Sequence, residues 1–418
     1  MRYALTLFLT LLFTGGLFAQ DTLRVLFLGN SYTYVNNLPQ IVADMARSTG
    51  DSLIFASNTP GGYTLEGHST NATSLSLIAQ GGWNYVVLQE QSQLPSFTDS
   101  EVQSMVFPYA RKLDSLINVA DTCTETVFYM TWGRKNGDAT NCAVWPPVCT
   151  YEGMDSLLYL RYMTMAQDNH AIVSPAGALW HYLRDNYPTL ELYQADESHP
   201  SEAGSYATAC AFYSVMYRKD PRLIAFDFTL SAVDAQNIRQ AAGLIVYDSL
   251  MKWHVGEYDP AADFVAVPAQ GNTISFVNSS VNACKYFWDF GDGQSSDEEN
   301  PVHVYASGGN YPVSLIASCC TTADTMIVNV TASQTGIEIE NSGIRLYPDP
   351  VADFLIIENR TDIRYEVRIL NDLGQELSLP VQRNGYQTTI GFGNAQSGIY
   401  FIVLENDRDR RLFRVLHQ

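Results

Sequence analysis

The sequence predicts an α/β domain with a parallel sheet, followed by two small all-β sandwich domains. Between residues 21 and 253, short apolar runs alternate with segments whose apolar residues recur at helical spacing. Beyond residue 260, apolar and polar residues alternate in short runs separated by turn-forming residues, and this texture returns from residue 344 onward. Strands alternating with helices form a parallel sheet covered on both faces, whereas closely spaced alternating strands form antiparallel sandwiches.

Each element of the first domain follows from a local pattern. The apolar runs that predict strands lie at residues 24–28, 84–88, 126–130 and 171–174. The stretches with helical spacing lie at residues 38–46, 102–118 and 154–168. The first strand ends at a Gly-Asn turn before a helix, so side chains of this turn are expected at the carboxyl edge of the sheet, where open α/β folds place their sites.

Length and charge limit the classes of function. The chain has 418 residues, of which 46% are hydrophobic, and this predicts about two to four domains with ordinary packed cores. It has 24 Lys and Arg residues against 44 Asp and Glu residues, and the resulting net charge of -20 repels phosphate backbones. Nucleic acid is therefore excluded as a partner.

The first residues predict export. Arg2 is followed by an apolar run at residues 3–13 and then by the small residue Ala19, which together are typical of a cleaved signal peptide over residues 1–19. No later segment reaches the roughly 18 consecutive apolar residues of a membrane helix. The mature chain is therefore expected to be exported and to have no transmembrane segment.

The seven cysteines fit an exported protein with disulfides. Cys142 and Cys149 bracket a short loop and are the expected local pair. Cys284 is expected to reach either Cys319 or Cys320 on a neighbouring strand. The sequence has no cluster of cysteine and histidine with zinc spacing, so no metal is expected.

Two short segments carry the residue types of a serine hydrolase. Ser31 lies in the turn after the first strand, where free N–H groups of the following helix favour a developing negative charge. Asp196 and His199 lie three residues apart, so the carboxylate can hold one imidazole nitrogen while the other takes the serine proton. Each residue alone is common in turns and helix caps, but the conjunction is not.

The two segments resemble the SGNH hydrolase family, and the resemblance covers residues 20–255. Leu26-Phe-Leu-Gly-Asn-Ser31 is similar to the first block of the family, whose serine is the nucleophile. Asp196-x-x-His199-Pro200 is similar to its last block, which supplies the acid and the base. The resemblance implies a flavodoxin-like three-layer fold, a catalytic triad and no cofactor. The G-x-S-x-G elbow of the α/β-hydrolases is absent from the sequence, as expected for this family.

The resemblance also implies an oxyanion hole built from the Ser31 N–H, a glycine N–H of the second block and an asparagine amide of the third. Gly62 is the expected glycine, with Gly61 as the alternative. In the third block Gln91 falls on the asparagine position, which departs from the family pattern and lengthens the side chain by one methylene. Gln89 is the alternative donor, because two residues along an extended segment keep the same face.

Four further residues are candidates for the substrate pocket. They lie in or near the blocks or at strand ends, and they are Asn30, His68, Trp132 and Tyr193. Aromatic residues at strand ends also serve as packing, which is the competing interpretation for this set.

The first β-rich segment, residues 260–332, resembles a PKD domain. It contains Tyr286-Phe-Trp-Asp-Phe-Gly-Asp-Gly293, in which Trp288 is expected to fill the core of the sandwich. Asp289 and Asp292 flank the expected hairpin turn, where they either form the turn or bind calcium.

The last segment, residues 344–418, follows a linker at 333–343 and resembles the C-terminal sorting domain of the Bacteroidota type IX secretion system. The matching stretches begin at Ile344, Leu370 and Ser397. Asp349 stands where asparagine is usual. The resemblance implies handling by the type IX secretion machinery and delivery to the cell surface or the outside.

Together these features predict an exported serine esterase that acts through Ser31, His199 and Asp196. By analogy, an acyl ester on a polysaccharide fits an exported enzyme with an accessory β-domain. The alternative is a surface carbohydrate-binding or adhesive protein whose first domain keeps the fold with little turnover.

Overall fold

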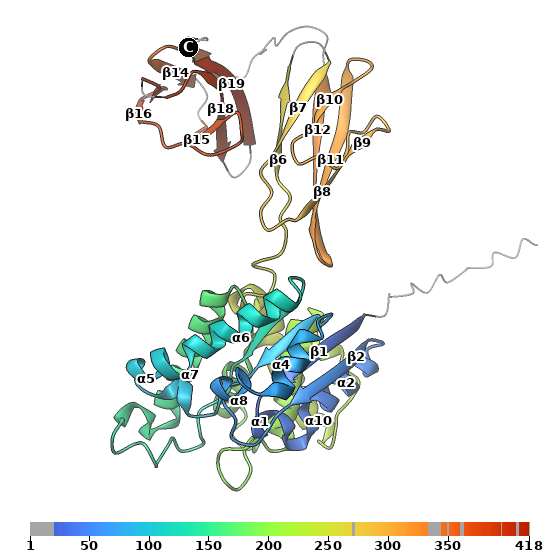
Figure 1. Cartoon of the computed structure of the whole chain (residues 1–418), viewed down its shortest axis with the longest axis vertical. Helices are drawn as coiled ribbons and strands as arrows, with labels where there is room; N and C mark the ends of the chain where they lie inside the picture. Colours follow the sequence, from blue (N-terminus) through green and yellow to red (C-terminus); the bar gives the residue numbers. More distant parts are fainter. Residues whose placement is uncertain are drawn as a thin grey trace, which may run out of the picture. The chain divides into compact units, whose positions relative to one another are not determined.

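The computed structural model describes residues 21–269, 272–332, 344–348, 351–359, 363–393, 395–406 and 409–417. The predicted signal peptide, the predicted linker and Asp349 lie outside the described residues. The chain divides into two compact units, Met1–Tyr258 and Asp259–Gln418, whose elements are labelled in Figure 1.

The first unit is built on a five-stranded parallel sheet with the order β2-β1-β3-β4-β5. Its strands are β1 (Thr22–Leu28), β2 (Ser52–Asn58), β3 (Tyr85–Leu88), β4 (Glu125–Tyr129) and β5 (Ile172–Ser174). This is the flavodoxin-like order, and the predicted fold class is confirmed. The strand β2 is absent from the sequence-based prediction, because as an edge strand it is only half buried and its sequence has no long apolar run.

Helices connect these strands and cover both faces of the sheet. They are α1 (Ser31–Tyr34), α2 (Leu38–Ser48), α3 (Leu65–His68), α4 (Ala72–Ala79), α5 (Asp99–Met105), α6 (Phe107–Ala120), α7 (Tyr151–Asn169), α8 (Ala176–Asn186), α9 (Glu202–Tyr217) and α10 (Ala232–Ile245). The single helix predicted at 102–118 is divided into α5 and α6, and Pro108 stands in the first turn of α6, where a proline is tolerated.

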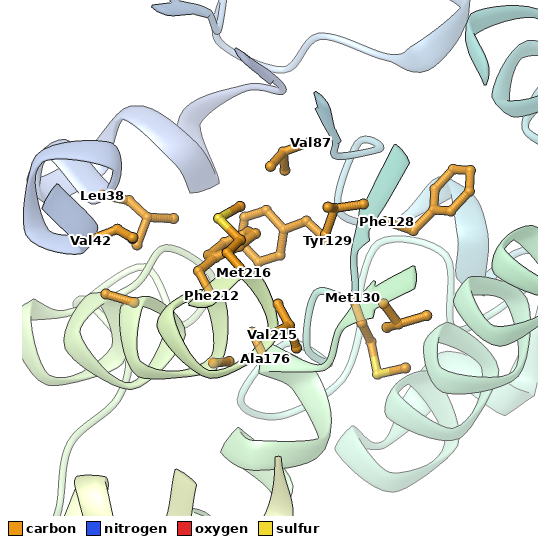
Figure 2. Packing of buried hydrophobic residues seen from close by; sticks show 14 of the residues in the cluster. Leu38, Val42, Val87, Phe128, Tyr129, Met130, Ala176, Phe212, Val215 and Met216 are labelled. Carbon is orange, nitrogen blue, oxygen red and sulfur yellow. The ribbon is translucent and has the colours of Figure 1, made fainter. Parts of the chain in front are cut away.

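The core of the first unit lies between the sheet and its two helical layers. Helices α2, α9 and α10 pack together on one side, while α4, α6 and α7 form the other layer. Figure 2 shows that Phe128 and Tyr129, neighbours on β4, point in opposite directions. The ring of Tyr129 lies 5.0 Å from that of Phe212 on α9, measured between centroids. The carboxyl ends of the strands are thereby held in one rigid edge, from which the site loops emerge.

The second unit is all antiparallel β structure. Residues 259–332 form a three-stranded sheet, β10-β7-β6, and a four-stranded sheet, β12-β11-β8-β9, while the later residues form the sheets β13-β14-β17-β16 and β15-β18-β19. The strands of the first part are β6 (Phe264–Pro268), β7 (Thr273–Asn278), β8 (Lys285–Asp289), β9 (Ser295–Ser296), β10 (Val302–Val304), β11 (Gly309–Cys319) and β12 (Thr322–Ala332). Those of the second part are β13 (Ile344–Tyr347), β14 (Phe354–Asn359), β15 (Glu366–Asn371), β16 (Val381–Asn384), β17 (Gln387–Gly391), β18 (Gly398–Asn406) and β19 (Asp409–His417).

Trp288 is fully buried in the core of the first of these β modules, as predicted. Its indole N–H donates to the carbonyl of Glu298 at 2.9 Å, so the polar edge of the ring is satisfied inside the core.

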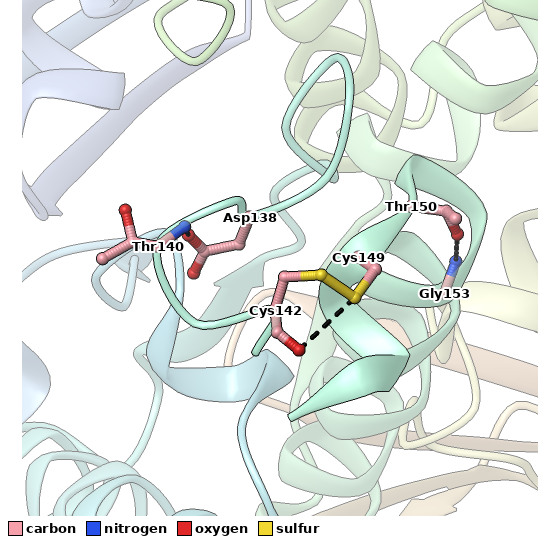
Figure 3. The surroundings of a disulfide bond; sticks show 6 residues. All are labelled: Asp138, Thr140, Cys142, Cys149, Thr150 and Gly153. Carbon is pink, nitrogen blue, oxygen red and sulfur yellow. Dashed lines mark hydrogen bonds between the residues drawn. A yellow bond between two sulfur atoms is a disulfide. The ribbon is translucent and has the colours of Figure 1, made fainter. Parts of the chain in front are cut away.

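Two disulfides join cysteines that were predicted to pair from the sequence. Cys142 bonds to Cys149 in the loop between β4 and α7, and Cys284 bonds to Cys319 rather than to Cys320. Figure 3 shows that Asp138, in the same loop, accepts the N–H of Thr140. The loop is therefore closed both by the disulfide and by a buried carboxylate.

Candidate active site

The turn that carries Ser31 is shaped by its two preceding residues. A Cβ on Gly29 would lie 2.6 Å from side-chain oxygens of Thr33 and Gln89, so only glycine fits between them. Asn30 caps helix α1, its Oδ1 accepting the N–H of Tyr32 at 3.2 Å. Ser31 follows as the first residue of the helix and is partly exposed at the edge of the sheet.

Ser31, His199 and Asp196 form a continuous chain of hydrogen bonds. The Ser31 hydroxyl lies 2.9 Å from Nε2 of His199, and Nδ1 of the same ring is hydrogen-bonded to Asp196. The other carboxylate oxygen of Asp196 accepts the N–H groups of Ser198 and His199, at 3.1 and 3.0 Å. Because a carboxylate only accepts, Nδ1 carries the proton and Nε2 is left to accept from the serine.

The electrostatics of Asp196 favour its ionised form. Burial alone would raise the pKa of this carboxyl, but hydrogen bonds from the His199 ring and from the two backbone N–H groups outweigh it and hold the pKa below its usual value. The carboxylate is therefore charged at neutral pH and can stabilise a protonated imidazole.

The loop from Asp196 to His199 is held from below by the backbone and by two aromatic residues. Glu197 adopts a φ of 60°, which is disfavoured for glutamate, and its carbonyl accepts the N–H of Lys135 at 2.9 Å. The indole N–H of Trp132 donates to the carbonyl of Ser198 at 3.1 Å. The hydroxyls of Tyr32 and Ser198 lie 2.6 Å apart.

These contacts belong to a buried column of aromatic rings. Tyr32 stacks on Trp132 at 4.9 Å, Trp132 on Trp180 at 3.6 Å, and Tyr193 meets Trp180 edge-on at 5.0 Å. Tyr32 also packs edge-on against His199, with ring centroids 5.5 Å apart. The role of Tyr32 was missed from the sequence, where the only signal is an aromatic residue directly after Ser31.

The column corrects the expected role of Trp132 and Tyr193. Both are buried, with exposed fractions of 0% and 3%, so their rings are not available to a substrate. They pack in the core below Ser31 and His199, which agrees with the competing interpretation that aromatic residues at strand ends serve as packing.

Asn30 and Gln89 form a buried lattice under the nucleophile turn. The two amide hydrogens of Gln89 are donated to Oδ1 of Asn30 and to the carbonyl of Glu90, at 2.8 and 2.6 Å. Oε1 of Gln89 accepts the Asn30 N–H and the Thr33 hydroxyl, both at 2.9 Å. The amide of Gln89 thus has no spare donor for an oxyanion, and Asn30, only 2% exposed, supports the turn instead of lining a pocket.

Gln91 lies in a different setting. The N–H groups of Gln93 and Leu94 donate to Oε1 of Gln91, at 2.7 and 3.2 Å, so the carbonyl end of the amide is fixed by its own loop. Its Nε2 donates one hydrogen to Oε1 of Gln93, whose own amide is held by the buried carboxylate of Asp138. Because an amide nitrogen carries two hydrogens, Gln91 retains one for another acceptor.

Gly61 and Gly62 are both exposed, and Gly62 has a φ of 68°, which glycine adopts without strain. Within the described ranges of the chain, the N–H groups of Ser31, Gly61 and Gly62 have no hydrogen-bond acceptor. They remain available to a bound group.

His68 lies behind the nucleophile turn. It is fully buried, and its Nε2 donates to the carbonyl of Gly29 at 2.9 Å while Nδ1 accepts from the hydroxyl of Ser74 at 2.7 Å. Burial lowers the pKa of the ring to about 4, so the ring is neutral at pH 7. The expectation that His68 lines a substrate pocket is therefore corrected, because its whole surface is covered by protein.

Glu90 is a buried carboxyl group that the sequence prediction passed over. Its Oε1 accepts the N–H of Gln91 at 2.6 Å, and both oxygens lie 3.2 Å from the N–H of Leu65, at the start of α3. Burial raises the pKa of Glu90 to about 8, although both N–H groups act to lower it. The available signal was a charged residue two positions after the end of the apolar strand β3.

Neither a metal cluster nor a membrane-spanning helix is found in the part of the chain that the structure describes. No group of three or more His, Cys, Asp or Glu side chains there is arranged to hold an ion. No helix among the same residues is both long and apolar enough to cross a bilayer.

Asp289 and Asp292 accept the N–H groups of Gly291 and Gln294, so both carboxylates form the turn.

Comparisons with known proteins identify both β-rich modules. Residues 259–332 match the family model of the PKD domain, and residues 345–415 match that of the secretion system C-terminal sorting domain. Both predicted resemblances are confirmed. The sorting domain directs the chain through type IX secretion, to the cell surface or the outside.

Solved structures similar to this chain include SGNH-type proteins. A DUF4886 family protein from Bacteroides uniformis is 16% identical, with 55% of this chain and 95% of that chain covered and a TM-score of 0.48. A protein from Slackia heliotrinireducens, assigned to the SGNH hydrolases, is 25% identical, with 47% and 100% covered and a TM-score of 0.39. The PKD1 domain of Vibrio anguillarum Epp is 30% identical, with 18% and 94% covered and a TM-score of 0.17.

Among curated proteins, a collagenase from Bacillus cereus (strain Q1) is 64% identical over 31 residues. The matched stretch is 7% of this chain and 3% of the collagenase. The chain therefore spans only a small part of that relative.

Proposed function

We propose that this chain is an exported serine esterase in which Ser31 is the nucleophile, His199 the general base and Asp196 the carboxylate that orients the base. The observation that carries the proposal is the hydrogen bond of 2.9 Å between the Ser31 hydroxyl and Nε2 of His199, with Asp196 on the other ring nitrogen. A nucleophile, a base and an orienting carboxylate in this order are the parts that acyl transfer requires.

The proposed reaction has two halves. As the Ser31 oxygen attacks the ester carbonyl, its proton moves to Nε2 of His199, which then passes it to the departing alcohol. The products of this half are the free alcohol and an acyl group on Ser31. In the second half Nε2 takes a proton from water, the hydroxide attacks the acyl carbonyl, and Ser31 recovers its proton as the acid leaves.

Three N–H groups are proposed to stabilise the oxyanion. They are the backbone N–H of Ser31, that of Gly62 with Gly61 as the alternative, and the second amide hydrogen of Gln91. Support for this set is that each group has a hydrogen with no acceptor among the described residues, whereas both amide hydrogens of Gln89 are already donated. Donors held ready at the site of the developing charge supply the largest single contribution in such reactions.

The proposed substrate is a short acyl ester on a polysaccharide. The chain is delivered to the surface or the outside, and it carries a PKD domain in addition to the sorting domain. By analogy, an acyl ester on a polysaccharide fits an exported enzyme with an accessory β-domain. No metal or organic cofactor takes part in the proposed steps.

The test is hydrolysis of 4-nitrophenyl acetate by the full chain and by Ser31→Ala, with Ser100→Ala, an exposed serine on α5, as the matched control. We expect Ser100→Ala to equal the unsubstituted chain and Ser31→Ala to lose activity by at least a thousandfold. Equal and slow hydrolysis by all three proteins would remove the esterase proposal and favour a surface-binding protein with an inactive domain.

A further inference from the structure

Glu90 contacts two segments beside the turn that carries Ser31: the segment that follows Gly61 and Gly62, and the segment that contains Gln91. Asn30, next to Ser31, donates through Nδ2 to the carbonyl of Tyr63 at 2.8 Å and lies 3.5 Å from the carbonyl of Glu90. The Glu90 carboxyl accepts the N–H of Leu65, at the start of α3 and shortly after Gly61 and Gly62, and the N–H of Gln91. One buried side chain therefore touches the backbone of both loops that carry the proposed oxyanion donors.

We infer that Glu90 is a positioning residue that sets the loop of Gly62 and the loop of Gln91 in register with Ser31. This inference rests on the proposed function. The fully buried carboxyl of Glu90 supplies the acceptor oxygen for the N–H groups of Leu65 and Gln91. Without this oxygen both N–H groups would lack a partner, and the segments of Gly62 and Gln91 would separate. Misplacing donors by about 1 Å costs on the order of a hundredfold in rate.

The protonation state of Glu90 affects the charge next to the proposed oxyanion. The pKa of Glu90, raised by burial to about 8, keeps the group neutral at pH 7, so it adds no negative charge beside the developing oxyanion. Among the described residues, Glu66 and Tyr162 are the titratable side chains that interact with it electrostatically. Glu66 on α3 is exposed and raises the pKa of Glu90 further, and Tyr162 on α7, whose hydroxyl accepts the Glu90 N–H at 3.3 Å, is itself kept neutral by burial. Above pH 8 the ionised carboxylate would oppose the oxyanion.

Two variants separate the effect of the acceptor oxygen of Glu90 from the effect of its charge. Glu90→Gln keeps an acceptor at the Oε1 position and cannot ionise, whereas Glu90→Met has a similar length and no acceptor. Glu152→Gln, an exposed carboxylate in the first turn of α7, is the matched control. All four full-length proteins are compared for kcat and KM with 4-nitrophenyl acetate from about pH 6 to 9, and for thermal unfolding by circular dichroism.

We expect Glu90→Met to lose roughly tenfold to a hundredfold in kcat with KM little changed, and Glu90→Gln to stay within about threefold of the unsubstituted chain at pH 7. The unsubstituted chain and Glu152→Gln should lose activity as pH rises through about 8, and Glu90→Gln should not. Unchanged kcat in Glu90→Met, or equal losses in Glu90→Met and Glu90→Gln, would overturn the inference.

If Glu90→Met does not fold, the pH profiles of Glu90→Gln and the unsubstituted chain decide, and an alkaline loss shared by both overturns the inference. Failure of the proposed function looks different. In that case the unsubstituted chain itself neither hydrolyses the ester nor reacts with a fluorophosphonate probe at Ser31.

Discussion

Replacing His68 by glutamine should remove a pH dependence from the stability of the first unit. The ring is buried and neutral, and burial lowers its pKa from 6.5 to about 4. Between these two values the unfolded chain binds a proton that the folded chain does not, so stability is complete above pH 6.5 and is lost as pH falls toward 4. At about 1.4 kcal/mol per pH unit, the total loss is about 3 kcal/mol.

The assay is chemical unfolding followed by tryptophan fluorescence at pH values from about 4.5 to 7.5. Glutamine can still donate to the carbonyl of Gly29, so His68→Gln should cost about 1 kcal/mol at pH 7 but show a shallower slope below pH 6.5. His170→Asn is the control, because it replaces an exposed ring at the end of α7 by a residue that also tolerates the left-handed backbone conformation found there. Parallel slopes for the unsubstituted chain and His68→Gln would refute the reasoning.

Two further predictions concern the proposed chemistry. Asp196→Asn should lower kcat by about a hundredfold to a thousandfold. The loss should be smaller than for a fully buried carboxylate, because solvent screens this half-exposed side chain. Steady-state kinetics with 4-nitrophenyl acetate measures kcat, and an unchanged kcat would contradict the orienting role of Asp196. Gln91→Ala should lower kcat by about 10²–10³ with KM little changed, measured in the same assay, whereas a near-normal kcat would exclude its amide as an oxyanion donor.

Local patterns predicted most of the fold and the three residues of the hydrogen-bonded chain. Four of the five strands of the first unit were visible as apolar runs, because β1, β3, β4 and the edge strand β5 are largely buried and therefore carry mostly apolar residues. The edge strand β2 was not, since its exposed positions carry no such signal. Ser31 was predicted from its place after the first strand, taken together with Asp196 and His199, whose separation of three residues has a chemical reason.

The supporting residues were harder to predict, because their roles depend on burial and on contacts between distant segments. Trp132 and Tyr193 were candidates for the substrate pocket, with packing as the competing interpretation, and Trp180 packs between them inside the protein. Tyr32 and Glu90 were not singled out, since no local pattern shows that one faces His199 or that the other bridges two loops. Sequence position alone does not separate residues that contact a substrate from residues that support the site from the core.

The most direct test of the account is to find which residue of the exported chain becomes covalently modified. The full chain is treated with a fluorophosphonate probe and its peptides are mapped by mass spectrometry, with His199→Ala treated in parallel. We predict a single phosphonyl group on Ser31 that forms at least a hundredfold more slowly in His199→Ala, because the imidazole no longer takes the serine proton. A chain that remains unmodified, or that is modified on another residue, would contradict the assignment of Ser31 as the nucleophile.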